Sequence, residues 1–304
     1  MIFREDNVDE LFKKSPHRRK MDVRQIKLSK IVSKATTVTP DISMIKAREI
    51  ILQKKVKRVI VVDKKKPIGI ITEKDIAKKI YELKNKSMRS VKAKDFKPRK
   101  LFILTKENNV QECAKIMKKN RISLVLILNK NKILEGIVTK TDLVKAYLTK
   151  DREPLKVSKI MKKQLITATP SDPILYIESL LLKYGISRII IKRNQKPVGV
   201  VTYRDFVPAK IPQWIAESAD PKEIHEYKFK KGLEENQANQ MSYLFPFHAT
   251  DIMTENPITI EADKDIKSAI TQMIKYNISG MPVIKKSKLV GIVTKSDIVN
   301  SLAV

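Results

Sequence analysis

Apolar positions in this chain recur in four similar stretches, and each stretch changes from helical to strand periodicity. Where apolar residues return every three or four positions, the spacing predicts an amphipathic helix with one buried face. In the first two stretches these positions are Ile42, Ile45, Ala47, Ile50 and Ile51, and then Val110, Cys113, Ala114 and Met117.

A β-branched or aliphatic run follows each predicted helix and is typical of a short buried strand. These runs cover residues 58–62, 124–128, 188–191 and 281–284. A turn rich in Lys, Asn or Pro comes next and leads into a second strand, so the two strands are expected to form a hairpin. A further helix is expected to close the unit, which therefore reads strand, helix, strand, strand, helix.

The end of every unit carries the same seven-residue motif. Its copies are GIITEKD at 69–75, GIVTKTD at 136–142, GVVTYRD at 199–205 and GIVTKSD at 291–297. Repetition on this scale indicates a duplicated structural unit. The motif glycines are 67, 63 and 92 residues apart, so an insert of about 40 residues separates the last two copies. A unit of about 60 residues buries little surface alone, so we expect the copies to pair as 26–150 and 155–304.

The motif G-h-h-T-x-x-D at the end of such a unit resembles the cystathionine-beta-synthase (CBS) domain. Copies three and four also carry the leading signatures VSKIM at 157–161 and ATDIM at 249–253. The resemblance implies an α/β fold in which four CBS domains pair into two Bateman modules, similar to the gamma subunits of AMP-activated protein kinase and to stand-alone archaeal CBS proteins. The expected division is a basic arm at 1–25, CBS domains at 26–88, 89–152, 153–210 and 248–304, and an insert at 211–247.

The same resemblance implies a ligand that contains adenosine, such as AMP, ADP, ATP or S-adenosylmethionine. A threonine at a helix start lies beside unpaired N–H groups that favour phosphate, and an aspartate three residues later can accept both ribose hydroxyls. The motif residues expected to bind nucleotide are Thr72, Asp75, Thr139, Asp142, Thr202, Asp205, Thr294 and Asp297. The alternative is helix capping alone, since Thr-x-x-Asp is close to a capping box.

The residues that begin the hairpin strands differ between copies, and this difference predicts which copies bind phosphate best. Copies one and three have arginines there, which the resemblance places against phosphates, so we expect Arg58 and Arg188 to mark the best sites. The alternative is a solvated strand end. In copies two and four, phosphate contacts must come from a neighbouring copy or be absent. The residues concerned are Arg58, Ser123, Ser187, Arg188 and Ser279.

Net charge is the second large feature of the chain. With 63 Lys and Arg against 33 Asp and Glu, the formal net charge is +30. Residues 1–150 contain 40 basic and 16 acidic side chains, and the rest contain 23 and 17. A nucleotide site needs few cations, so this excess predicts a polyanionic partner. A lysine-biased proteome or thermal adaptation is the alternative, although thermal adaptation usually raises Glu together with Lys.

Folded RNA, and the ribosome above all, is the partner that the charge favours. Few aromatics interleave the basic runs, which argues against single-strand stacking. The expected RNA-binding residues are Lys13, Lys14, Arg18, Arg19, Lys20, Lys54, Lys55, Lys64, Lys65 and Lys66. Such a protein would be an energy-responsive ribosome-associated or hibernation factor. The alternative is a nucleotide-sensing regulatory subunit that controls a partner enzyme.

Catalysis finds little support in the sequence. The three histidines are widely separated, no phosphate loop or HExxH motif is present, and Cys113 is expected to be a buried, inert thiol. We therefore expect a non-enzymatic regulatory protein without a metal. The single cysteine and the lack of a long apolar stretch predict a cytoplasmic protein that does not enter the membrane. The Lys and Ile content is typical of an AT-rich prokaryote, expected to be archaeal. The sequence leaves open whether the protein forms a homodimer.

Overall fold

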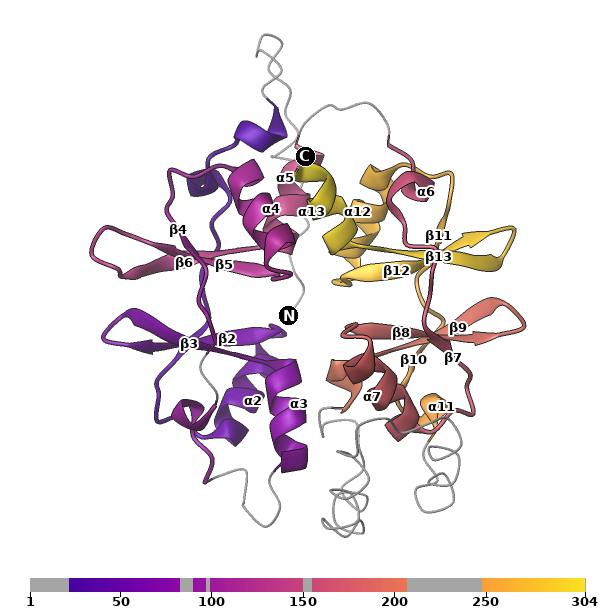
Figure 1. Cartoon of the computed structure of the whole chain (residues 1–304), viewed down its shortest axis with the longest axis horizontal. Helices are drawn as coiled ribbons and strands as arrows, with labels where there is room; N and C mark the ends of the chain where they lie inside the picture. Colours follow the sequence, from indigo (N-terminus) through magenta and orange to yellow (C-terminus); the bar gives the residue numbers. More distant parts are fainter. Residues whose placement is uncertain (1–21, 83–89, 97–98, 150–154, 207–247, 304) are drawn as a thin grey trace.

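The four predicted units each form a small sheet flanked by helices, and the four sheets are arranged in two halves (Figure 1). The computed structural model describes residues 22–82, 90–96, 99–149, 155–206 and 248–303. We number the units copies 1 to 4 in chain order. Copies 1 and 2 make one half and copies 3 and 4 the other, as expected for two Bateman modules.

Copies 1 and 2 follow the predicted order of elements. Copy 1 contains β1 (Thr37–Val38), α2 (Met44–Gln53), β2 (Arg58–Asp63), β3 (Lys66–Thr72) and α3 (Glu73–Glu82). Copy 2 contains β4 (Ile103–Leu104), α4 (Val110–Lys119), β5 (Leu124–Leu128), β6 (Leu134–Thr139) and α5 (Lys140–Leu148). Short 3-10 helices precede them at η2 (Val23–Gln25), η3 (Leu28–Lys30) and η4 (Ala93–Asp95).

Copies 3 and 4 repeat the order with one difference. Copy 3 contains α6 (Val157–Ile160), β7 (Thr167–Ala168), α7 (Ile174–Lys183), β8 (Arg188–Arg193), β9 (Lys196–Thr202) and the 3-10 turn η5 (Tyr203–Phe206). Copy 4 contains α11 (Ala249–Ile252), β10 (Thr254–Glu255), β11 (Ile260–Glu261), α12 (Ile266–Lys275), β12 (Gly280–Lys285), β13 (Lys288–Thr294) and α13 (Lys295–Leu302). In copy 3 the described residues after the motif threonine form η5 rather than the expected α-helix, and the predicted insert at 211–247 lies outside the described residues.

Each sheet places the motif threonine opposite the first residue of the preceding strand. The first strand of a copy pairs in parallel with the second, and the second and third form an antiparallel hairpin. The hairpin register therefore aligns Arg58 with Thr72 and Arg188 with Thr202. In copy 1 the turn residues Lys64 and Lys65 have φ of 46° and 65°, the left-handed pair that a tight hairpin requires.

The segments that lead into copies 1, 3 and 4 pack on the other copy of the same module. Ser33, which precedes copy 1, exchanges two backbone hydrogen bonds of 2.9 Å with Ile137 of copy 2. Lys162, which precedes copy 3, does the same with Ile292 of copy 4. Strand β10 precedes copy 4 and extends the sheet of copy 3 by pairing with β9. We call these stretches the leading segments; they tie the two copies of a module together.

Two apolar clusters explain how the copies are held. Within the first module, Ile60 of β2 packs with Leu124 and Leu126 of β5, so the sheets of copies 1 and 2 face each other. A larger cluster joins copies 2 and 4, where α13 packs against α4 and α5 (Figure 1). Burial of this shared apolar surface is the main attraction between the two modules.

Candidate functional site

The motif threonines and aspartates cap the helices that follow them. In copy 2 the carboxylate of Asp142 accepts hydrogen bonds from the Thr139 N–H at 2.7 Å and hydroxyl at 2.6 Å. In copy 4 Asp297 accepts the same two from Thr294 at 2.8 and 2.6 Å. Thr72 with Asp75 and Thr202 with Asp205 repeat the arrangement. Capping therefore occurs in every copy, and each uses one carboxylate oxygen, Oδ2.

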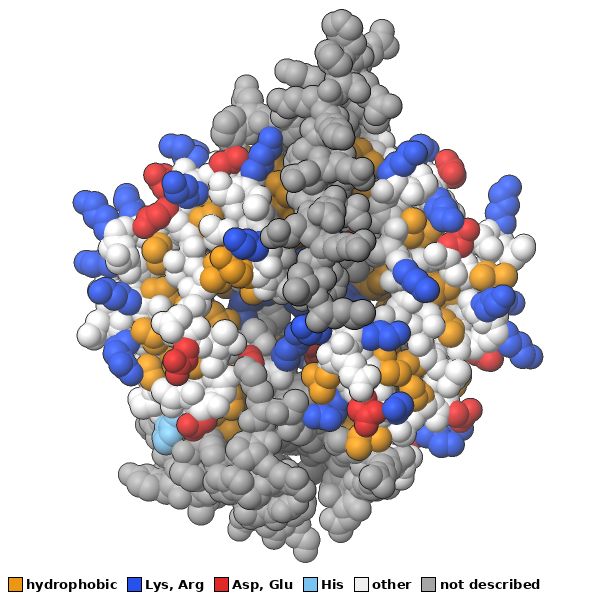
Figure 2. All heavy atoms as spheres, turned by 180° about the vertical axis from the view of Figure 1, so that it is seen from behind, with side chains coloured by type: hydrophobic (Ala, Val, Ile, Leu, Met, Phe, Trp, Pro, Cys, Tyr) orange, Lys and Arg blue, Asp and Glu red, His pale blue; other side chains and the backbone are white. Residues whose placement is uncertain are grey.

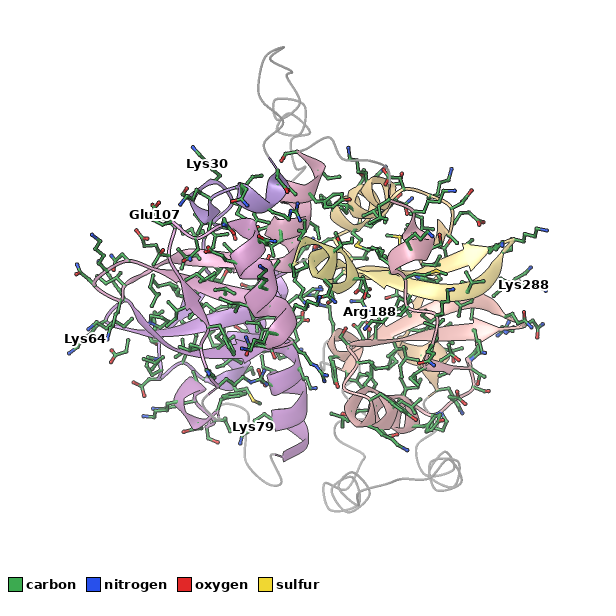
Figure 3. All side chains as sticks on the ribbon, turned by 45° about the horizontal axis from the view of Figure 1, so that its top comes forward. Lys30, Lys64, Lys79, Glu107, Arg188 and Lys288 are labelled. Atoms are coloured by element: carbon green, nitrogen blue, oxygen red, sulfur yellow. The ribbon has the colours of Figure 1, made fainter. Side chains whose placement is uncertain are left out.

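The basic residues at the strand starts reach across to serines of neighbouring copies. Arg58 of copy 1 donates to the Ser123 hydroxyl of copy 2 at 3.0 Å. Arg188 of copy 3 and Lys57 of copy 1 both donate to the Ser279 hydroxyl of copy 4, at 2.7 and 2.8 Å. Three copies thus meet at one hydroxyl, and Figure 3 shows Arg188 between the two halves.

Gly280 makes room for this meeting of copies. A Cβ at this position would collide with the guanidinium of Arg188 and would lie 2.8 Å from the Thr294 methyl and 2.9 Å from the Val293 carbonyl oxygen. Copy 4 therefore begins its hairpin with glycine because the arginine of copy 3 crosses that position.

Lys140 and Lys295, the residues immediately after the motif threonines of copies 2 and 4, form a reciprocal pair of contacts. Lys140 donates to the Ser296 hydroxyl at 2.8 Å, and Lys295 donates to the Thr141 hydroxyl at 3.1 Å. Each lysine therefore reaches the second residue of the opposite motif helix. The arrangement brings the N-termini of α5 and α13, both favourable to anions, to one place.

Copies 1 and 3 also meet through the first and second residues after the motif threonine, but there a cation is paired with an anion. Arg204 donates from Nε to Glu73 at 2.6 Å, and Lys74 lies over the Tyr203 ring at 4.9 Å from its centroid. The first residue after the threonine again meets the second residue of the opposite copy. The ion pair cancels charge here, whereas Lys140 and Lys295, on the side of copies 2 and 4, each contact a hydroxyl.

Burial lowers the pKa values of Lys57, Lys295 and Arg188, and repulsion between cations lowers those of the two lysines further. Burial first, and then Arg188, lower the pKa of Lys57 to about 8. Burial, Lys145 and Arg188 lower the pKa of Lys295 to about 8. Burial also lowers the pKa of Arg188 to about 10, against an opposing contribution from Asp297. Lys57 keeps water-accessible surface although protein atoms surround it, which fits a side chain between two domains.

Five cations from four copies therefore converge, and their arrangement suits a multiply charged anion. An unpaired buried charge is costly, and a phosphate group would supply both the opposite charge and hydrogen-bond acceptors. We name Lys57, Arg58, Lys140, Arg188 and Lys295 the central cation cluster. Sequence reasoning ranked Arg58 and Arg188 but missed Lys140 and Lys295, whose signal was a lysine directly after the motif threonine in two copies.

The remaining predicted nucleotide residues lie in different surroundings. The Asp75 carboxylate pairs with Arg99, while Asp142 also accepts from the Ser33 hydroxyl at 3.4 Å. Asp205 is buried, and Ser187 is exposed beside Arg188. Each arginine bonds a serine of a neighbouring copy, so Arg58 and Arg188 each connect two copies.

The predicted RNA-binding residues are partly outside the described residues. Lys13, Lys14, Arg18, Arg19 and Lys20 belong to this undescribed part of the chain. The others, Lys54, Lys55, Lys64, Lys65 and Lys66, are exposed. Lys64 and Lys288 mark hairpin turns at opposite ends of the molecule (Figure 3), and Figure 2 shows Lys and Arg along both edges with Asp and Glu among them. Surface charge in the described parts is therefore spread over both modules.

The described residues give little support for metal binding or for thiol chemistry. They contain no group of three or more His, Cys, Asp or Glu side chains placed to hold a metal ion. Cys113 is fully buried, and burial followed by the charge of Asp142 raises the pKa of its thiol to about 12. None of the helices described here has the length and apolar content to cross a membrane.

The four repeats match a known family along most of the chain. The sequence model of the CBS domain matches residues 23–82, 93–149, 157–211 and 249–304. The chain therefore belongs to the CBS domain family.

Several proteins with similar sequences come from archaea. Protein MJ1225 of Methanocaldococcus jannaschii is 23% identical over 298 residues, which is 93% of this chain and 100% of that one. Its crystal structure, described as a candidate archaeal homologue of g-AMPK, has a TM-score of 0.74, covering 91% of this chain and all of that chain at 20% identity. Protein MJ1404 of the same organism is 26% identical over 88% of this chain. The chain spans 59% of MJ1404 and 61% of the Methanopyrus kandleri protein MK0525.

Proposed function

We propose that this protein binds adenine nucleotides between its copies and regulates a partner in response. The central cation cluster carries the proposal, since it joins all four copies and favours a phosphate. The motif aspartates would hold ribose, as Asp297 could through Oδ1, the carboxylate oxygen that its helix cap does not use. Membership of the CBS family supports a ligand that contains adenosine; the structures of CBSX2 with AMP and of the MJ0100 CBS domain pair with S-adenosylmethionine concern other proteins.

The role of the motif residues and of the arginines follows from this proposal. Thr72, Thr139, Thr202 and Thr294 would present their helix N-termini to phosphate. Arg58 with Ser123, and Arg188 with Ser279, would place a cation and a hydroxyl at each phosphate. Binding that bridges copies 2, 3 and 4 would favour one arrangement of the two modules over another, which is what regulation by a ligand requires.

Calorimetric titration of the whole chain with AMP, ADP and ATP tests the proposal. We expect binding to the natural protein and a loss of at least tenfold in affinity for Arg188→Ala, because one charge-assisted contact contributes about 1.5–3 kcal/mol. Arg193→Ala is the matched control, since Arg193 ends the same strand β8 and is exposed. Thermal unfolding of both variants confirms that they fold. A natural protein that binds none of the three nucleotides contradicts the proposal.

A second candidate, docking on folded RNA or the ribosome, rests on the net charge of +30. Exposed basic turns at both ends of the molecule would contact phosphates, and such binding weakens steeply with salt. Sedimentation with ribosomes across a salt series, with and without AMP and ATP, tests it. Co-migration that salt weakens and nucleotide shifts supports this candidate; its absence at low salt favours control of a partner enzyme.

A further inference from the structure

The aspartate of copy 1 differs from that of copy 4 because a cation from the chain itself holds it. Oδ2 of Asp75 accepts from the Thr72 N–H at 2.9 Å and hydroxyl at 2.6 Å, as in the other copies. Oδ1 accepts from the guanidinium of Arg99, which lies in the segment leading into copy 2. Both oxygens of the carboxylate are therefore occupied by the chain.

The equivalent carboxylate of copy 4 provides the comparison. Asp297 uses Oδ2 for the Thr294 cap, and within the described residues no hydrogen bond is recorded for its Oδ1. One carboxylate oxygen has two lone pairs, so it can accept a hydrogen bond from each hydroxyl of a ribose diol if nothing else occupies it. Asp297 retains an oxygen for this purpose, whereas Asp75 would have to release Arg99 first.

The sequence of the leading segment explains why copy 1 is the exception. The four segments align as Ile31-Val32-Ser33-Lys34, Phe96-Lys97-Pro98-Arg99, Ile160-Met161-Lys162-Lys163 and Ile252-Met253-Thr254-Glu255. Ser33 and Lys162 each donate a backbone N–H to the partner sheet, at 2.9 Å. Proline at the same position has no N–H to donate.

The space beside the motif glycine shows how closely a leading segment packs on its partner sheet. A Cβ at Gly136 would lie 2.7 Å from the Ser33 carbonyl oxygen, and one at Gly291 would lie 2.9 Å from that of Lys162. In the segment that leads into copy 2, Arg99 bonds to the motif aspartate of copy 1.

We propose that Arg99 closes the ribose position of copy 1 by occupying the Asp75 carboxylate, so that copy 1 stays empty while nucleotide binds elsewhere in the protein. This inference rests on the proposed function and assigns the specificity of one of its sites. Arg99 is half-exposed and Asp75 is largely buried, so the ion pair can exchange with a competing ligand without unfolding the copy.

The experiment counts AMP molecules bound per chain by equilibrium dialysis, on the full-length protein. Arg99→Ala is expected to bind one more AMP than the natural protein. Lys163→Ala is the matched control, since Lys163 holds the same position in the segment leading into copy 3 and is exposed; it should leave the number unchanged. Adding Asp75→Asn to Arg99→Ala should remove the extra site.

The outcomes separate the two proposals. If the natural protein binds AMP and Arg99→Ala binds the same number or fewer, the closure is overturned while the proposed function stands. A loss of one site on Asp75→Asn alone also overturns the closure, because copy 1 would then be in use. Failure of both the natural protein and Arg99→Ala to bind AMP, ADP or ATP overturns the proposed function and the closure together.

Discussion

Arg204 of copy 3 and Glu73 of copy 1 form an ion pair that bridges the two modules, with Nε to Oε1 at 2.6 Å. The Glu73 side chain retains 12% of its exposure, so the pair is partly shielded from water. It lies on the side of the molecule where copies 1 and 3 meet through α3 and η5. The opposite side, between copies 2 and 4, is held by an apolar cluster instead.

The coupling between Glu73 and Arg204 should be measurable by a double-mutant cycle. We expect Glu73→Gln, Arg204→Ala and the double variant to give a coupling of about 1 kcal/mol in the free energy of unfolding, at the upper end for an exposed pair. Urea denaturation measures it. Lys46 and Glu49, an exposed pair within α2, provide the control and should couple by about 0.3 kcal/mol. Equal coupling for the two pairs would show that the contact between copies adds nothing.

Alanine at Gly136 should destabilise the protein. The new methyl group of Gly136→Ala would press on the Ser33 backbone, which cannot turn aside, so we expect a loss of about 2 kcal/mol in the free energy of unfolding. Thermal unfolding of this variant and of the natural protein measures the loss. An unchanged unfolding midpoint contradicts the packing described for the leading segments.

Anion binding at the central cation cluster should take up protons near pH 8.5. The pKa values of Lys57 and Lys295 are lowered to about 8, so both lysines are partly neutral there, and a bound phosphate would raise them. AMP affinity should therefore fall as pH rises through 8 and 9. Calorimetry at pH 8.5 in buffers of different ionisation enthalpy measures the uptake.

The same pKa values give the sign of the stability effect without ligand. Lysine in the unfolded chain has a pKa near 10.5, so between pH 8 and 10.5 the unfolded state binds more protons than the folded one. The contribution of these two lysines to the free energy of unfolding therefore increases with pH over this window. Lys57→Met should reduce both this increase and the proton uptake, while Lys192→Met, on β8, should alter neither.

Cys113 should resist alkylation in the folded protein. The thiol is fully buried in α4 and burial raises its pKa to about 12, so little thiolate exists at pH 8 and reagents cannot reach it. Iodoacetamide followed by mass spectrometry should show modification in denaturant and none under native conditions. Rapid native labelling would mean that α4 opens frequently.

Local periodicity predicted the repeats of this fold because each unit repeats the same short-range pattern. The hairpin strands, the amphipathic helices and the motif that ends each unit all appear where the sequence placed them. In copies 1, 2 and 4 an α-helix follows the motif threonine as expected. In copy 3 the described residues after Thr202 form a 3-10 turn, and the rest of the predicted helix lies outside the described residues.

Contacts between copies could not be predicted, because the residues that meet are far apart in sequence. Lys57 and Ser279 are 222 residues apart, and Lys140 and Ser296 are 156 apart. Without knowledge of which copies pack together, Lys140 and Lys295 could not be distinguished from the many other lysines. The preference for Arg58 and Arg188 came from chemistry, but their serine partners required the three-dimensional arrangement.

Because leading segments pack on the other copy of a module, one repeat is not expected to fold by itself. A fragment cut to one repeat would leave a sheet edge without its partner, as β9 would be without β10. An edge exposed in this way invites pairing with another chain and aggregation. The two copies of a module therefore cover each other's sheet edges, and one whole module is the shortest piece of this chain expected to fold without pairing with another chain.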